Sequence, residues 1–137
     1  MATFVLYDAS VVVQSVDLSD HVRSVTIDAG QNLVDDTAMG DTFQSNAAGL
    51  ATWSMSIEFL QDYAASKVDA TLQPRLGIGN TTTLVVKPTS GSVSSTNPSY
   101  SGTGILDSYN PVGGAVGDQA MTTASFQSAS ALTRATS

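Results

Sequence analysis

The amino-acid sequence predicts a mainly β protein: a two-sheet β-sandwich or barrel protomer flanked by one short α-helix, with a long loop and terminal arms. Three observations lead to this prediction. Apolar and polar residues alternate over residues 51–59, clusters of Gly, Pro and Asn separate the apolar segments, and a single stretch has helical periodicity. With one helix beside six or more strands, most of the core must lie between strands.

The clearest strand is residues 51–59, in which Trp53, Met55, Ile57 and Phe59 share one face of a sheet. A helix would scatter the same side chains around its axis. A second strand covers residues 82–87 and ends at Pro88, because proline has no N–H for a ladder. Further strands are expected at residues 4–7, 11–14, 22–28, 100–109 and 119–127.

The one helical segment is expected at residues 63–72. Asp62 is suited to cap it, and Pro74 follows its end. Its apolar face would be formed by Ala64, Val68 and Leu72, spaced four residues apart. Because no repeat or linker divides the chain, we expect one domain over residues 1–137, with residues 1–3 and 129–137 as arms.

Acidic side chains are concentrated in the first part of the chain. Residues 1–50 contain seven Asp and one basic residue, Arg23, whereas the remainder is nearly balanced. Asp35, Asp36 and Asp41 lie close together in a segment with poor periodicity. This segment is interpreted as a polar loop or arm, and residues 35–44 are its centre.

The composition excludes several classes of protein. The chain has 12 acidic and 5 basic residues and no cysteine, with a pI near 4.1. Disulfide scaffolds and cysteine-ligated zinc sites are excluded. A nucleic-acid binder is disfavoured because counterion release needs clustered Lys and Arg. A protein that DNA merely passes remains compatible with the composition.

The surface is expected to be short of charge. Only 12% of the residues are charged, and 35 of the 137 are Ser or Thr. Charge depletion is typical of the core of protein interfaces, so an obligate oligomer is favoured over a monomer. The alternative is a secreted or virion β protein that is kept soluble by hydroxyl groups and net acidity.

No Sec-type signal is expected at the start of this sequence. The first ten residues contain no basic residue, and their apolar run stops at Asp8. No apolar run approaches the ~20 residues that a membrane-spanning helix needs. We therefore expect no membrane association and synthesis as a soluble chain in the cytoplasm.

His21 is the only histidine and the first candidate for catalysis. A Ser-His-Asp site would need it, but no G-x-S-x-G sequence occurs. The neighbouring Asp17, Ser19 and Asp20 are typical turn residues that lead into the strand at Val22. A structural role is predicted for His21.

The other candidate sites have simple structural interpretations. Asp35, Asp36 and Asp41 lack the order of a calcium loop, so a solvated acidic loop is favoured over a Ca²⁺ site. The Gly77/Gly79 and Gly102/Gly104 pairs do not continue into a nucleotide-binding motif, and the Asn80 sequon has no secretion signal beside it. Core or interface roles are expected for the aromatic residues on strands, namely Trp53, Phe59, Tyr100, Tyr109 and Phe126. No catalytic, cofactor-binding or metal-binding residue is therefore predicted, and the chain is not expected to be an enzyme.

Several segments in order resemble the tail tube, or major tail, proteins of long-tailed non-contractile bacteriophages. DLSDHVRSVTID at residues 17–28, with the Asp-rich residues 35–42 after it, resembles their N-terminal part. NPSYSGTGILDSY at residues 97–109, the PVGG at 111–114 and the Phe126-Gln127 ending resemble their C-terminal part. With the Trp53 strand and the single helix, the resemblance spans nearly the whole chain.

The resemblance implies a β-sandwich protomer that assembles into homohexameric rings stacked head to tail. Each protomer would give strands to a continuous β-barrel around a channel, in a fold shared with contractile-tail tubes and type VI secretion tubes. The implied partners are further copies of the chain, the tape measure, tail terminator and baseplate or tail-tip proteins. DNA would pass through the lumen without specific binding, no cofactor would be needed, and the protein would be located in the virion tail.

Two hypotheses follow, and other classes of protein remain open. An acidic or hydroxyl-rich lumen would let DNA slide, because it offers no cations to the phosphates. Residues 1–3, 35–44 and 129–137 would be mobile in the free subunit and ordered by contacts between rings. The alternatives are another virion component, such as a capsid decoration or head-tail connector protein, a carbohydrate-binding or adhesion module, and an enzyme.

Overall fold

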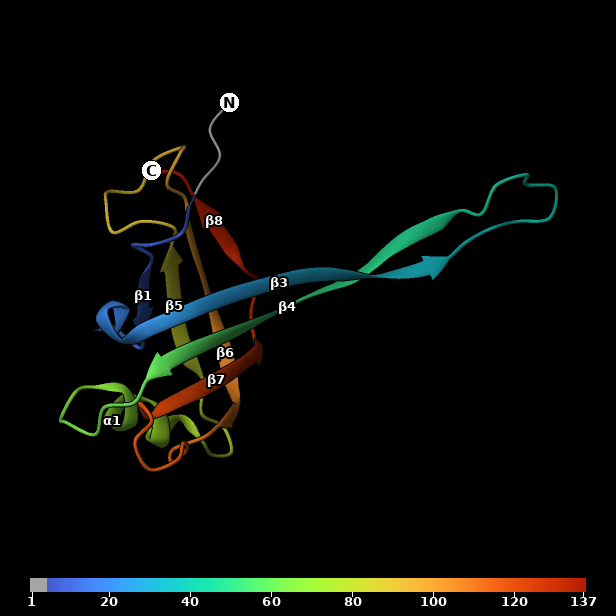
Figure 1. Ribbon diagram of the computed structural model, residues 1–137. Helices are drawn as coiled ribbons and strands as arrows, with labels where there is room; N and C mark the ends of the chain where they lie inside the picture. Colours follow the sequence, from blue (N-terminus) through green and yellow to red (C-terminus); the bar gives the residue numbers. More distant parts are fainter. Residues whose placement is uncertain (1–4) are drawn as a thin grey trace.

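The computed structural model describes residues 5–137 and consists of a compact head from which one long hairpin projects (Figure 1). Its strands are β1 (Ser10–Val13), β2 (Val16–Asp17), β3 (Val22–Asp35), β4 (Asn46–Leu60), β5 (Thr82–Lys87), β6 (Ser99–Tyr109), β7 (Met121–Ser128) and β8 (Thr133–Ala135). Its helices are α1 (Val68–Leu72) and the 3₁₀ helices η1 (Ser19–His21) and η2 (Gln73–Arg75). The expected N-terminal arm, residues 1–3, lies outside the described residues.

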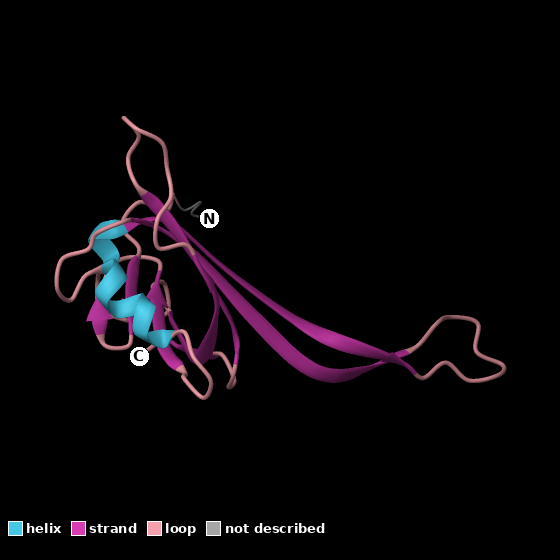
Figure 2. Ribbon diagram, turned by 90° about the horizontal axis from the view of Figure 1, so that it is seen from below, coloured by secondary structure: helices cyan, strands magenta, loops and turns pink. Residues whose placement is uncertain are grey.

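The mainly β class with one short α-helix is confirmed. The strands, however, are hydrogen-bonded into one antiparallel sheet, in the order β2-β1-β5-β6-β7-β4-β3, and β8 adds to β6. β3 and β5 are not neighbours in this order, yet Val25 and Ile27 of β3 line the same groove as Val86 of β5, which indicates that the sheet curls. The core expected between two sheets therefore lies inside one curled sheet. Figure 2 shows the helix beside the head and the hairpin extending away from it.

The core is built from alternate residues of five strands and from the helix. Met55, Ile57 and Phe59 of β4 meet Phe126 of β7 and Leu84 of β5, all of them buried. Their ladder partners on β7 face the same side, since Met55 pairs with Phe126 and Ile57 with Ala124, whereas adjacent residues along β4 face opposite sides. The remaining buried hydrophobic residues are Val11, Val13, Leu18, Trp53, Val68, Leu72, Val86, Leu106 and Ala124.

Most expected strands occur where the sequence predicts them. β5 matches residues 82–87, and β1, β6 and β7 differ from their expected bounds by one or two residues. The strand expected at residues 4–7 is wrong for residues 5–7, which form no strand. β3 and β4 are longer than expected, because their ladder continues to Asp35↔Asn46, far beyond the core.

The helix is shorter than expected, and its first half is a turn. Residues 63–67 do not form helix, and α1 begins only at Val68. Ser66 has a positive φ of 61°, a conformation that no helix contains. The buried helical face consists of Val68, Thr71 and Leu72, whereas the expected Ala64 is exposed.

The C-terminal segment, expected as an arm, lies along the head in this protomer. β8 pairs with the first residues of β6, and Leu132 packs against the core. The Trp53 indole N–H donates to the Ser130 carbonyl at 2.7 Å. A Cβ at Gly102 would lie 2.8 Å from the Trp53 ring, so glycine is needed where β6 passes under the indole.

Candidate assembly surfaces

The projecting hairpin, here called the arm, consists of residues 29–52. Its two strands pair from Gly30↔Thr52 to Asp35↔Asn46, yet nearly all of its side chains are exposed. Residues 29–34 and 46–52, the stem of the arm, include no charged side chain. A two-stranded ribbon without a core is marginally stable by itself, so the arm needs a further surface to pack on.

Both edges of the arm are open to further strands. β3 is the last strand of the sheet, and β4 pairs with β7 only from Ser54 onward. Natural proteins usually block such edges with charges, prolines or covering loops. The stem of the arm carries none of these devices and exposes Leu33 and Leu50. It is therefore suited to pair with another chain.

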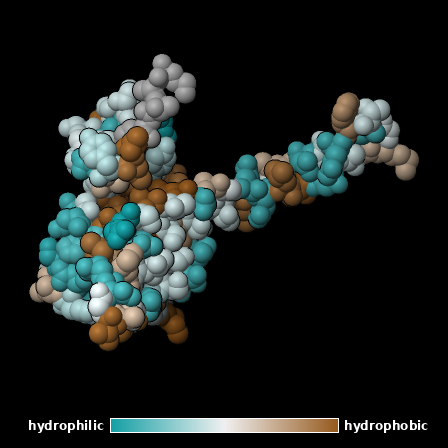
Figure 3. Space-filling view, viewed as in Figure 1, coloured by the Kyte–Doolittle hydropathy of each residue, from teal (hydrophilic) through white to brown (hydrophobic). Residues whose placement is uncertain are grey.

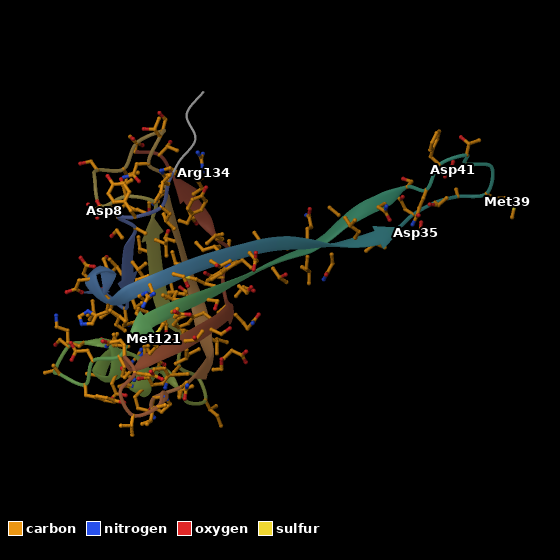
Figure 4. The ribbon with its side chains drawn as sticks, in the orientation of Figure 1. Asp8, Asp35, Met39, Asp41, Met121 and Arg134 are labelled. Atoms are coloured by element: carbon orange, nitrogen blue, oxygen red, sulfur yellow. The ribbon has the colours of Figure 1, made fainter. Side chains whose placement is uncertain are left out.

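The tip of the arm, residues 36–45, combines acidic turns with exposed apolar side chains. Met39 is 104% exposed and Phe43 is 86% exposed. An Asp35 carboxylate oxygen accepts the Thr37 N–H at 2.9 Å, and Asp41 accepts the Ala38 N–H at 2.7 Å. Figure 3 shows brown residues at this tip, and Figure 4 shows Met39 pointing outward beside Asp35 and Asp41.

These aspartates act as turn formers in the described structure. Thr37 lowers the pKa of Asp35, through its side chain first and its backbone N–H second. Within residues 5–137, no three His, Asp or Glu side chains gather as metal ligands would. The arm-or-loop interpretation of residues 35–44 is therefore supported, and the Ca²⁺ alternative gains no support.

A second surface, the hydroxyl face, is the outer side of the sheet in the head. Across β3, β4 and β7 it consists of three rows, namely Ser24–Glu58–Thr123, Thr26–Ser56–Ser125 and Asp28–Ser54–Gln127. These residues alternate with the core residues of the same strands. The charged side chains on the head portions of β3, β4, β6 and β7 are Asp28, Glu58 and Asp107, against the single Arg23.

A groove of about 570 Å³ lies where the arm leaves the head. Trp53 and Leu132 are its largest lining residues. The rest are small or hydroxylated and uncharged, namely Ala29, Gly30, Ala51, Thr52, Ser128, Ala129, Ser130 and Ala131. The groove continues the uncharged surface of the arm onto the head.

His21 lies in a polar cluster at the start of β3. Its Nδ1 is 2.7 Å from Asp20 and its Nε2 is 2.9 Å from Asp62, which follows β4. Among the described residues no Ser hydroxyl is bonded to the ring, and the Ser19 hydroxyl instead accepts the Val11 N–H of β1 at 2.9 Å. The prediction of turn residues around His21 fits this arrangement, but its link to Asp62 was not predicted, because 41 residues separate the pair.

The cluster continues into a network below the sheet. Asp62 accepts the Ala64 N–H at 2.9 Å, and Tyr109 donates to Asp69 on α1 at 2.8 Å. Gln61 donates to the Tyr109 hydroxyl at 3.0 Å. Burial raises the pKa of Tyr109 to about 12, and the Asp69 carboxylate adds to the shift. The network fixes the segments after β4 and β6 to α1.

The aromatic side chains singled out in the sequence belong to the core. Trp53, Phe59 and Phe126 are buried, and Tyr100 and Tyr109 are half-buried.

None of the helices within residues 5–137 has the length and apolar character that a membrane span requires. The surface features that sequence reasoning missed are the stem of the arm and the groove at its base, since small residues such as Ala and Gly give no periodic signal.

Comparison with known proteins finds this fold in virus-like tails. One chain from the virion of a native gene transfer agent particle superposes with a TM-score of 0.74 at 17% identity, covering 93% of this chain and 95% of that one. A chain from the tail of an empty gene transfer agent particle, solved with C6 symmetry, gives 0.68 at 18%, covering 82% and 81%. The SPP1 tail tube gives 0.73 at 12%, covering 95% and 77%.

At the level of sequence, no family model and no curated protein matches the chain. The structural likeness therefore shows a shared fold. At the level of the fold, the likeness to tail tube proteins that the sequence indicated is confirmed.

Proposed function

We propose that this chain is a structural virion protein that polymerises as stacked hexameric rings into a tail tube, through which DNA passes. The observation that carries the proposal is the likeness, over 93% of the chain, to a chain of the gene transfer agent virion. The tail of a similar particle was solved with sixfold symmetry, which supports rings of six. A structural role also fits the described residues, in which the polar clusters fix loops.

The arm supplies the physical reason for self-assembly. An uncharged ribbon with two open edges and an apolar tip gains most when strands of other copies pair with it. A contact between different patches of identical chains is heterologous, and it produces rings or helical stacks. The groove at the base of the arm extends the same uncharged surface, so it belongs to the contact area between copies.

We assign the hydroxyl face to the lumen of the tube. It is free of apolar clusters, and its head strands carry three acidic side chains against Arg23. DNA bears one negative charge per ~1.7 Å of duplex, so a wall with few cations repels it weakly and does not hold it. The opposite side of the sheet faces the core and α1 and cannot line a channel.

The proposal extends to the partners of a tail. Tape measure, tail terminator and baseplate or tail-tip proteins would contact the tube at its ends or inside it, and the assembled protein would reside in the virion after synthesis in the host cytoplasm. No cofactor is required by any of these contacts.

Negative-stain electron microscopy of the purified full chain tests the proposal. We expect rings with six subunits and tubes of variable length, which a capsid decoration protein would not form. A protein that stays monomeric at millimolar concentration, with and without a tail initiator complex, would contradict it.

The lumen assignment has its own test. Tubes of the natural sequence should release duplex DNA at low salt, whereas tubes of Ser56→Lys, which adds six cations per ring, should retain it until salt is raised. Gln73→Lys, at an exposed position on η2 and not on the hydroxyl face, is the matched control and should behave like the natural tube. Equal retention by the two Lys variants would refute the assignment.

A further inference from the structure

The head has a second groove, apolar and distinct from the one at the base of the arm, that the tube function by itself assigns to no contact. We propose that this apolar groove receives the tip of the arm of a second copy, with the Phe43 ring inserted between β3 and β5. The inference rests on the proposed function, because it names the partner of the arm within the tube. It can fail alone, since tubes could form through other contacts of the arm.

The apolar groove lies at an open end of the core. Its main lining residues come from β3, β5, β6 and the segment before β1, namely Leu6, Val25, Ile27, Val86, Lys87 and Tyr100. Val11, Val86 and Tyr100 are successive ladder partners across β1, β5 and β6, and Val11 is fully buried. The groove therefore opens directly onto the core. Figure 3 shows brown residues on this part of the head, above β3.

The apolar groove has room for one aromatic ring. Its volume is about 230 Å³. An engineered apolar cavity of ~150 Å³ already binds benzene, so a phenyl ring fits here. Leu6 is exposed and Tyr100 is half-buried, which leaves the apolar lining open to water. Covering it with a ring would remove apolar surface of both partners from water.

The tip of the arm presents complementary features. Phe43 is exposed, and three aspartates lie near it in the sequence. Asp35 and Asp41 accept backbone N–H groups of the tip itself. Within residues 5–137, by contrast, no hydrogen bond or ion pair engages the Asp36 carboxylate. Asp36 is therefore available to a cation on another chain.

Charge favours the apolar groove over the groove at the base of the arm. The Lys87 Nζ donates to one backbone carbonyl at 2.9 Å, which leaves two of its three N–H donors for a partner. The Asp8 carboxylate, which lies by the loop after β5, already accepts the Ser90 hydroxyl at 2.6 Å. Arg134, the ladder partner of Tyr100, adds a second cation on this side of the head. The lining of the groove at the base of the arm is uncharged and offers the aspartates of the tip no partner.

The occupant must come from a second copy. Figures 1 and 2 show the arm extending away from the head, so the tip of a protomer does not reach its own groove. A contact between the tip of one copy and the groove of the next joins two different patches, so it repeats from copy to copy instead of closing on a dimer. A stack of rings requires contacts of this kind.

Chemical cross-linking tests the docking, because the natural chain has no cysteine. Full-length Phe43→Cys and Leu6→Cys proteins, one of them tagged, are mixed, allowed to assemble and treated with a short bis-maleimide. We expect a mixed dimer on denaturing electrophoresis, since a docked tip brings the two thiols within reach of the linker. Phe43→Cys mixed with Thr123→Cys, at an exposed position of the hydroxyl face, is the matched control and should give little of it.

A charge exchange tests the ion pair between the tip and the groove. Asp36→Lys and Lys87→Glu should each raise the concentration needed for assembly by roughly threefold to tenfold, because each places like charges together. The double variant Asp36→Lys/Lys87→Glu should return it close to the natural value. Asp36→Lys combined with Lys67→Glu, at the only other lysine, should not.

The outcomes separate this inference from the proposed function. Tubes without the mixed dimer of Phe43→Cys and Leu6→Cys, as expected if another segment covers the groove, would overturn the docking and leave the tube function standing. Equal linkage to Thr123→Cys, or no rescue by the double variant, would also overturn it. The mixed dimer in small oligomers without tubes would support the docking and contradict the tube function. A chain that neither cross-links nor assembles would contradict both.

Discussion

Strands β3 and β4 run through both the head and the arm, but their surroundings in the two regions are opposite. In the head, β4 places Met55, Ile57 and Phe59 in the core, and β7 covers its second edge. In the arm, the same strand exposes Leu50 and pairs with β3 alone. The head is therefore stabilised by burial within the chain, whereas the arm must obtain its burial from outside it.

This contrast explains the uneven composition. Charged side chains occur on strands, helices and loops of the head, whereas the stem of the arm carries none. A free protein of this kind would risk aggregation, since open uncharged edges recruit other strands. In a protein that polymerises, the same open edges would serve to bind the next copy. Variants that affect head and arm differently can therefore test the comparison.

The largest expected difference lies between two phenylalanines. Phe59→Ala removes a fully buried ring and should lower the free energy of unfolding by about 3–5 kcal/mol. Phe43→Ala, at the tip of the arm, should change it by less than ~0.5 kcal/mol, because no described contact of the head is lost. Denaturant titration of dilute, unassembled protein measures both. Phe43→Ala should nevertheless reduce the yield of tubes. An equal loss of unfolding free energy in both variants would show that the arm is stabilised by burial within the chain, as the head is.

Two glycines give the next contrast. Gly102→Ala places a methyl group 2.8 Å from the Trp53 ring, which is fixed by its bond to Ser130, so we expect a loss of about 1–3 kcal/mol. Trp53 fluorescence should report a displaced C-terminal segment. Gly30→Ala, in the stem of the arm, meets nothing within 4 Å and should be neutral to slightly stabilising. A similar loss of unfolding free energy for both variants would show that the stem of the arm packs against other residues in solution.

A charged side chain in the stem of the arm should prevent assembly without lowering the stability of the fold. Leu33→Lys adds a cation at an exposed position of β3, so its free energy of unfolding should stay within about 0.5 kcal/mol of the natural value. Tubes should not form, because pairing at this edge would bury an unpaired charge. Gln73→Lys adds the same positive charge on η2, away from the arm, and should still assemble. If Leu33→Lys formed normal tubes in electron micrographs, the stem of the arm would not take part in the contacts between copies.

The sequence predicted the head better than the arm, for a physical reason. Alternation over residues 51–59 exists because one face of β4 is buried, and β5 was located to the residue for the same reason. The stem has no buried face within its own chain, so its Ala, Gly and Asn residues carry no period, and its strands were placed only as far as residue 28 and from residue 51. The His21–Asp62 contact depends on tertiary folding that local patterns do not encode.

The smallest expected effect is on the stability of the protein in acid. It compares two aspartates with lowered pKa values, one in the head and one in the arm. The pKa values of Asp62 and Asp35 both lie below 3.8, the first because of the Ala64 N–H and His21, the second because of Thr37. A lowered pKa contributes stability above the unfolded value, and this is lost as the pH falls through the folded value. Asp62 joins parts of the head, so Asp62→Asn should flatten the decline of unfolding free energy as the pH falls below about 5. Asp35 closes only a turn of the arm, so Asp35→Asn should leave that curve unchanged while altering amide exchange at residues 36–45. If Asp35→Asn flattened the global curve as much as Asp62→Asn, the arm would share in the cooperative unfolding of the head, and the two regions would not be independent in the free protomer.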